Sequence, residues 1–195
     1  METTVPSDDN KARTERSYKL LLLFAMISMT MMFAGITSAF VVSKSRADWL
    51  KNFQLPIAFY FSTAVIIGCS ITFHLAKKAI QKDNRSATTT FLLSTLGLGI
   101  AFVILQFVGF GQIVENGYYF TGSESSITTT FLYIVTLVHL LHLAGGIISL
   151  LIIIYNHFKQ KYNSTQTIGI ELGAMYWHFL DILWVFLFLF LYFFK

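Results

Sequence analysis

Residues 171–184 read ELGAMYWHFLDILW, and they place Glu171, His178 and Asp181 within an apolar run that extends from Ile168 to Phe194. A bilayer requires about 20 apolar residues per helix, so this run is long enough to cross one, and it is too apolar for an ordinary soluble helix. Ionisable side chains are costly in hydrocarbon. Three of them in one membrane helix therefore indicate a role in function or assembly.

The composition of the whole chain also indicates a membrane protein. Of its 195 residues, 55% are hydrophobic and 12% are charged, as in polytopic membrane proteins. The single cysteine, Cys69, lies in an apolar run and leaves little room for a disulfide framework or a thiolate metal site. The net charge is +4, without a basic stripe that alternates with aromatic residues, so we expect no nucleic-acid partner.

Five apolar runs are long enough to span a bilayer, and each is predicted to be a helix because a helix satisfies its own backbone hydrogen bonds in lipid. The predicted fold class is all-α, a polytopic bundle of five transmembrane helices. We expect a hydrophilic cytoplasmic tail at residues 1–17 and one transmembrane domain at residues 18–195. The spans are expected at about 18–42, 55–76, 88–113, 127–158 and 167–194.

Lysine and arginine are unevenly divided between the two sides of this arrangement, with ten on one side and four on the other. Cytoplasmic loops carry the excess, which predicts a cytoplasmic N-terminus and a periplasmic C-terminus. The larger group is Lys11, Arg13, Arg16, Lys19, Lys77, Lys78, Lys82, Arg85, Lys159 and Lys161, and the smaller group is Lys44, Arg46, Lys51 and Lys195.

The fourth and fifth runs carry polar residues at helical spacing. His139 and His142 are three residues apart, and the following Gly145 and Gly146 allow another helix to approach closely. Consecutive segments tend to be neighbours, so we expect the polar residues of the two runs to share one layer. That layer comprises His139, His142, His178 and Asp181, with Glu171 two turns away near the same face as His178.

Three interpretations of this layer compete. The first, which we favour, is a hydrogen-bonded network that joins two helices. The second is a zinc or iron site, although the His-Glu-x-x-His and paired Glu-x-x-His patterns are missing. The third is a proton relay, which needs a continuous polar path to one surface. In the first and third runs, the polar residues that could contribute to such a path are only Ser28, Thr30, Thr37, Ser38 and Gln106.

Three stretches of the chain are similar to one known family. They are Glu171-x4-Tyr176-Trp177-His178-Phe179-x-Asp181 with Trp184-x-Phe186-Leu187, then Tyr133 to Gly146, and Phe33-Ala34-Gly35. The first resembles the last helix of the cytochrome c oxidase subunit III family, the second its penultimate helix, and the third its Phe-Ala-Gly stretch. The match covers essentially the whole chain after the tail, and it resembles the family's five-helix form, without the first two of seven helices.

The resemblance implies a non-redox accessory subunit III of a bacterial haem–copper terminal oxidase, which supports the catalytic subunit, lipid packing and proton uptake in aerobic respiratory electron transfer. The partners that it implies are oxidase subunits I and II, membrane lipids and a larger respiratory supercomplex. The location that it implies is the bacterial inner (plasma) membrane. It places haem and copper on partner subunits, bound phospholipid on this chain, and no catalytic, cofactor or metal site here. The structural residues implied are His139, His142, Glu171, His178 and Asp181 in a polar network, and Gly145, Gly146, Trp177 and Trp184 in helix packing.

One residue departs from the family pattern. Many members carry a membrane-buried glutamate just before the Phe-Ala-Gly stretch, and Met29 stands at that position here. Two other functions stay open from the residues alone. One is subunit III of a quinol oxidase, and the other is a stand-alone membrane metalloenzyme that uses His139, His142, His178 and Asp181. A small transporter is disfavoured, because the sequence shows no inverted repeat and no pair of broken helices.

Overall fold

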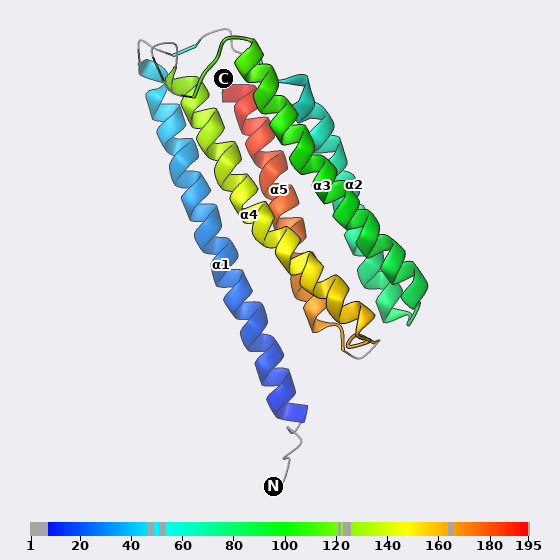
Figure 1. Cartoon of the computed structure of the whole chain (residues 1–195). Helices are drawn as coiled ribbons and strands as arrows, with labels where there is room; N and C mark the ends of the chain where they lie inside the picture. The colour runs from blue at the N-terminus through cyan, green and yellow to red at the C-terminus, as the bar shows by residue number, and fades with distance from the viewer. Residues whose placement is uncertain are drawn as a thin grey trace.

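The computed structural model describes residues 8–46, 49–50, 54–120, 122, 126–163 and 166–194. Within these residues it contains five long helices, each long and apolar enough to cross a membrane, which confirms the predicted all-α, multi-span fold (Figure 1). A short 3-10 helix, η1 (Ser43–Ser45), follows the first of them. The five are α1 (Asp8–Val42), α2 (Ile57–Gln81), α3 (Arg85–Glu115), α4 (Ile127–Phe158) and α5 (Ile168–Phe194).

Three helices extend further than the apolar runs predict. Helix α1 begins at Asp8, within the expected hydrophilic tail, and α2 and α3 are prolonged to Gln81 and back to Arg85. Hydropathy marks only the part of a helix that lies in lipid, whereas charged residues with good helix propensity continue the same helix into water. Of the residues used to predict the orientation, Lys51 and Lys195 lie outside the described residues.

Helix α5 is the central element of the bundle and packs against α1, α2 and α4. Helices α2 and α3 form the most extensive pair and lie side by side at one edge, while α1 lies at the other edge (Figure 1). The turn between α2 and α3 is tight because Asp83 adopts a positive φ of 53° and the side chain of Asn84 accepts a hydrogen bond from the Ala87 amide at 3.1 Å.

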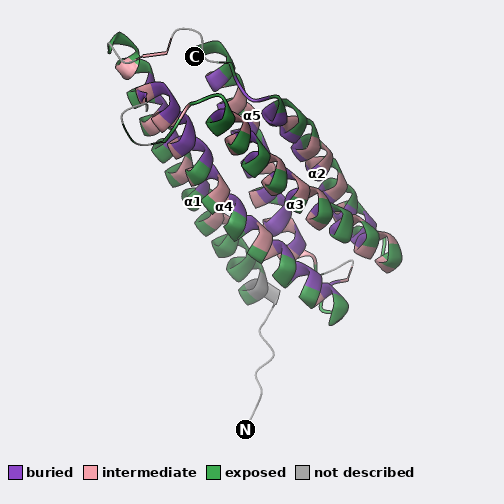
Figure 2. Cartoon of the chain, turned by 45° about the horizontal axis from the view of Figure 1, so that its top comes forward, coloured by how far each residue is buried: buried purple, intermediate pink, exposed green. Residues whose placement is uncertain are grey.

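The buried side chains gather where the helices face one another, and apolar residues on the outer faces are exposed (Figure 2). Lipid tails are as apolar as leucine, so close packing rather than water exclusion holds such a bundle together. Trp184 is at the centre of this packing. Its indole ring meets Phe102 edge-on at 5.2 Å and Phe59 edge-on at 5.7 Å between ring centroids.

Gly109 on α3 leaves room for an aromatic side chain in the core of the bundle. A Cβ atom at Gly109 would overlap the ring of Phe59, which is wedged between Trp184 and Phe110. We therefore expect Gly109→Val to lower the free energy of unfolding by about 1–3 kcal/mol, the usual cost of overpacking. Thermal unfolding in detergent checks this. Gly111→Val is the matched control, because a Cβ atom there meets nothing within 4 Å; equal losses in both variants would contradict the expectation.

Candidate functional site

Two aromatic side chains of α5 bind backbone carbonyls of α4. The Trp177 indole Nε1 donates to the Gly146 carbonyl at 3.1 Å, and the Tyr176 hydroxyl donates to the His142 carbonyl at 3.0 Å. Gly146 permits this approach, because a Cβ atom there would lie 3.1 Å from Leu180. The last two helices are thus joined through aromatic side chains and main-chain oxygens.

Two further hydrogen bonds cross the bundle between α2 and its neighbours. Trp184 Nε1 donates to Thr63 Oγ1 at 3.1 Å, and Gln106 Nε2 donates to Ser62 Oγ at 2.9 Å. A tryptophan or tyrosine in an apolar span has one polar atom that needs a partner. This rule predicts from the sequence that Tyr176, Trp177 and Trp184 each need a hydrogen-bond partner, although it does not identify the acceptor.

Glu171 connects α5 to α1. Its Oε2 atom forms an ion pair with Lys19 Nζ at 2.9 Å, and its Oε1 atom accepts from the Thr167 hydroxyl at 3.1 Å. Sequence reasoning missed this pair. The signal was present, because the first and fifth of five spans begin on the same side of the membrane, and Lys19 and Glu171 lie near those two beginnings.

The ion pair is expected to stabilise the bundle only slightly, because its side chains are 41% and 23% exposed and solvent screens them. We expect a double-mutant cycle of Lys19→Ala and Glu171→Gln to give a coupling energy of no more than about 1 kcal/mol, which falls as salt is added. Thermal unfolding in detergent at two salt concentrations measures it. A coupling that salt does not change would mean that the pair is shielded from solvent.

His178 and Asp181 face α2 rather than α4. His178 Nδ1 and Ser70 Oγ share a hydrogen bond at 2.6 Å, and the His178 ring lies 6.2 Å from the ring of His74. Asp181 is only 4% exposed, and the Ser70 side chain of α2 interacts with its carboxyl group. Asp181 and Ser70 line one hollow of about 210 Å³ between α2 and α5.

His139 and His142 lie on the other side of α5. The His139 ring is fully buried between Phe33, Phe102 and Trp184, with centroid distances of 6.5, 6.1 and 5.2 Å. Neither of its ring nitrogens has a partner among the described residues. His142 Nδ1 donates to the carbonyl of Val138 in its own helix at 2.7 Å.

The four residues expected in one layer thus form two separate pairs. Trp177, Leu180 and Trp184 are fully buried, and their spacing of three and four residues makes them one face of α5. Each residue of a helix is rotated by about 100° from the one before it. Because His178 and Asp181 directly follow Trp177 and Leu180, they are turned away from α4 and toward α2.

The separation of the pairs bears on metal binding. Within the described ranges, no group of three or more histidine, cysteine, aspartate or glutamate side chains is close enough to hold a metal ion. The four residues His139, His142, His178 and Asp181 therefore do not form a common ligand set in this structure. The geometry gives no support to a stand-alone metalloenzyme built on them.

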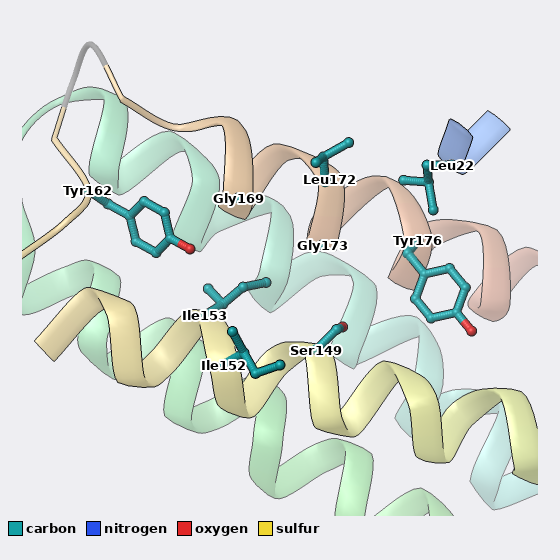
Figure 3. A pocket seen from close by; sticks show the side chains of 9 residues that line it. All are labelled: Leu22, Ser149, Ile152, Ile153, Tyr162, Gly169, Leu172, Gly173 and Tyr176. Carbon is teal, nitrogen blue, oxygen red and sulfur yellow. The ribbon is translucent and has the colours of Figure 1, made fainter. Parts of the chain in front are cut away.

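A larger hollow of about 340 Å³ opens between α4 and α5, near Leu22 of α1 (Figure 3). Figure 3 shows Tyr162 at one end of the hollow and Tyr176 at the other, with α5 along one side and α4 along the opposite side. Gly169 and Gly173 of α5 line the hollow. A Cβ atom at Gly169 would overlap Tyr162, and one at Gly173 would overlap Ile153. The lining is otherwise mostly apolar, with Ser149, Ile152 and Leu172 completing it.

The family model of cytochrome c oxidase subunit III matches residues 1–195. The chain belongs to the cytochrome c oxidase subunit III family. Among curated relatives, cytochrome c oxidase subunit 3 of Spodoptera frugiperda is 34% identical over 140 residues, which are 72% of this chain and 89% of that protein.

Other members of the subunit III family are longer. The Drosophila yakuba protein is 33% identical over 140 residues, which are 72% of this chain and 50% of that protein. The Petromyzon marinus protein is 31% identical over 143 residues, which are 73% of this chain and 51% of that protein. The matched part of the chain thus spans about half the length of these relatives. Family membership and five apolar helices make this a multi-pass membrane protein.

Proposed function

We propose that this chain is a non-redox accessory subunit of a haem–copper terminal oxidase, located in a bacterial plasma membrane with its N-terminus cytoplasmic. The observation that carries the proposal is how the last helix uses its polar groups. Glu171, His178 and Trp184 bind Lys19, Ser70 and Thr63, which belong to other helices of this chain. Polar groups used in this way stabilise a bundle rather than perform chemistry.

We assign haem and copper to partner subunits, with subunits I and II as the direct neighbours. A haem ligand must present an imidazole nitrogen to the iron. The buried His139 ring is packed against three aromatic rings of this chain. This packing supports our assignment of electron transfer to the partner subunits.

The hollow shown in Figure 3 fits the acyl chain of a membrane phospholipid. Its walls are aliphatic apart from Ser149 and the two tyrosines. Lys19 precedes the lining residue Leu22 by three residues on α1. An acyl chain held in the hollow packs against Leu22, Ile152 and Leu172. This role requires no chemistry from the chain itself.

The proposed function is tested by removing this subunit from the purified oxidase. We expect the haem spectra and the initial rate of oxygen consumption to be retained, while activity is lost faster during turnover. Adding back the wild-type chain should restore the lifetime of the enzyme. Loss of the haem or copper spectra on removal, or an unchanged lifetime, would contradict an accessory role.

A further inference from the structure

Two histidines face each other across the seam between α2 and α5. The rings of His74 and His178 lie 6.2 Å apart between centroids, at an angle of 54°. His74 is exposed and lies one turn before Lys77 and Lys78 on α2, and His178 is half-buried on α5. Lysine side chains near the end of a membrane helix extend their ammonium groups to water. The histidine pair therefore lies where an ion from the aqueous side can reach it.

The Ser70 hydroxyl determines which nitrogen of His178 carries the hydrogen. Nδ1 of His178 and Oγ of Ser70 are 2.6 Å apart, and the Ser70 side chain also interacts with the carboxyl group of Asp181. An ionised carboxyl group only accepts hydrogen bonds, so the Ser70 hydroxyl turns its hydrogen toward Asp181 and its oxygen accepts from Nδ1 of His178. The lone pair of His178 is then on Nε2. A metal-binding imidazole usually donates its other N–H in this way.

The spacing of the two rings suits a single metal ion. Zinc lies about 2.0–2.1 Å from an imidazole nitrogen, which places the centroids of two imidazoles on one tetrahedral ion about 5 Å apart. The observed 6.2 Å is larger by about 1 Å, and rotation of the exposed His74 side chain closes this difference. Imidazole nitrogens bind zinc, copper and nickel. The two rings can thus share one divalent ion of this class.

The charges and ligands around the pair also allow a cation. Lys77 interacts with His178, but it interacts with the carboxylate of Glu171 as well. Among the residues that the structure describes, no third histidine, cysteine or carboxylate is close enough to complete a ligand set of protein side chains. Water therefore fills the remaining positions of a four-coordinate ion.

We propose that His74 and His178 form a binding site for a divalent transition-metal ion such as Zn²⁺. Nε2 of His178 is one ligand, an imidazole nitrogen of His74 is the second, and Ser70 is a positioning residue that orients the His178 ring. The bound ion links α2 to α5. This inference goes beyond the proposed function and does not depend on it, because both ligands belong to this chain.

A zinc titration of the full chain in detergent, purified without a histidine tag and in competition with a chromophoric chelator, tests the site. We expect the wild-type chain to bind one zinc ion and to unfold at a higher temperature when zinc is present, since an ion that binds only the folded state stabilises it. His74→Ala should lower the affinity about tenfold or more and abolish this shift, and His74→Cys, which supplies a thiolate ligand, should restore zinc binding. Ser70→Ala should lower the affinity about tenfold, the usual effect of removing a group that orients a ligand.

The matched control is His142→Ala, which removes a histidine of α4 that donates to Val138 of its own helix. We expect this variant to bind zinc as the wild type does. Replacing the exposed His74 removes no core contact, and thermal unfolding without zinc verifies that each variant is folded. No zinc binding by the wild-type chain, equal affinity in wild type and His74→Ala, or a loss of binding in His142→Ala would each overturn the proposal.

Discussion

Replacing Trp177 by alanine is expected to lower the free energy of unfolding of the bundle by about 3–5 kcal/mol, the range for large aromatic side chains removed from a packed core. The Trp177 ring is fully buried and contacts three helices besides its own. It meets Phe73 of α2 at 6.2 Å, lies against Gly99 of α3 and donates its indole hydrogen to Gly146 of α4. Alanine removes all of these contacts and leaves a cavity where four helices meet.

Two further variants separate packing from hydrogen bonding at this position. Trp177→Phe keeps most of the ring contacts and loses the bond to Gly146, which is worth about 0.6 kcal/mol on average in membrane helices. Phe193→Ala is the control for removing an aromatic side chain from α5, because Phe193 is 71% exposed. Unfolding in detergent should rank the losses as Trp177→Ala largest and Phe193→Ala smallest. Similar losses for the two alanine variants would show that Trp177 does not organise the bundle.

Asp181→Ala is expected to weaken assembly of the oxidase and to leave the redox centres unchanged. Asp181 is buried at the middle of α5, where it lies beside Ser70 of α2. Alanine removes the carboxyl group from between these two helices and loosens their packing, so we expect the amount of partner subunit that co-purifies to fall about tenfold, which corresponds to about 1.4 kcal/mol. The haem spectra of the complex that still forms should match those of the wild type, because on our proposal the haem is bound by partner subunits.

Quantitative mass spectrometry of the purified complex, together with its optical spectra, checks this expectation. Asp181→Asn is the matched control, since an amide of nearly the same shape still presents an oxygen acceptor. Normal assembly with Asp181→Ala would remove the structural role of this residue. A changed haem spectrum would place Asp181 closer to the redox centres than our account allows.

The sequence predicted the helices well because the membrane imposes a simple length rule on them. Five apolar runs became five helices, and α4 begins and ends at the predicted residues. The start of α1 at Asp8 was not predicted, because its first turns are hydrophilic and only the apolar part of a helix is visible to hydropathy. The predicted orientation depends on loop charges and stays a prediction.

The contacts of the candidate site were harder to predict, because they depend on how α5 is rotated. The spacing of His178 and Asp181 put them on neighbouring faces but did not say which helix those faces meet. Packing of the large residues Trp177 and Trp184 decides the rotation, and it turns His178 toward Ser70 of α2. The acceptors of Trp177 and Tyr176 are backbone carbonyls, which carry no sequence signal.

The central claim is that this chain works as one subunit of an oxidase, and the most direct test is to identify the proteins that co-purify with it after mild detergent extraction. Our account predicts a large haem–copper subunit in near-equal amount, with companions that reveal whether cytochrome c or quinol is the electron donor. Purification of the chain alone, without haem-containing partners, would contradict the account and leave only its family and fold established.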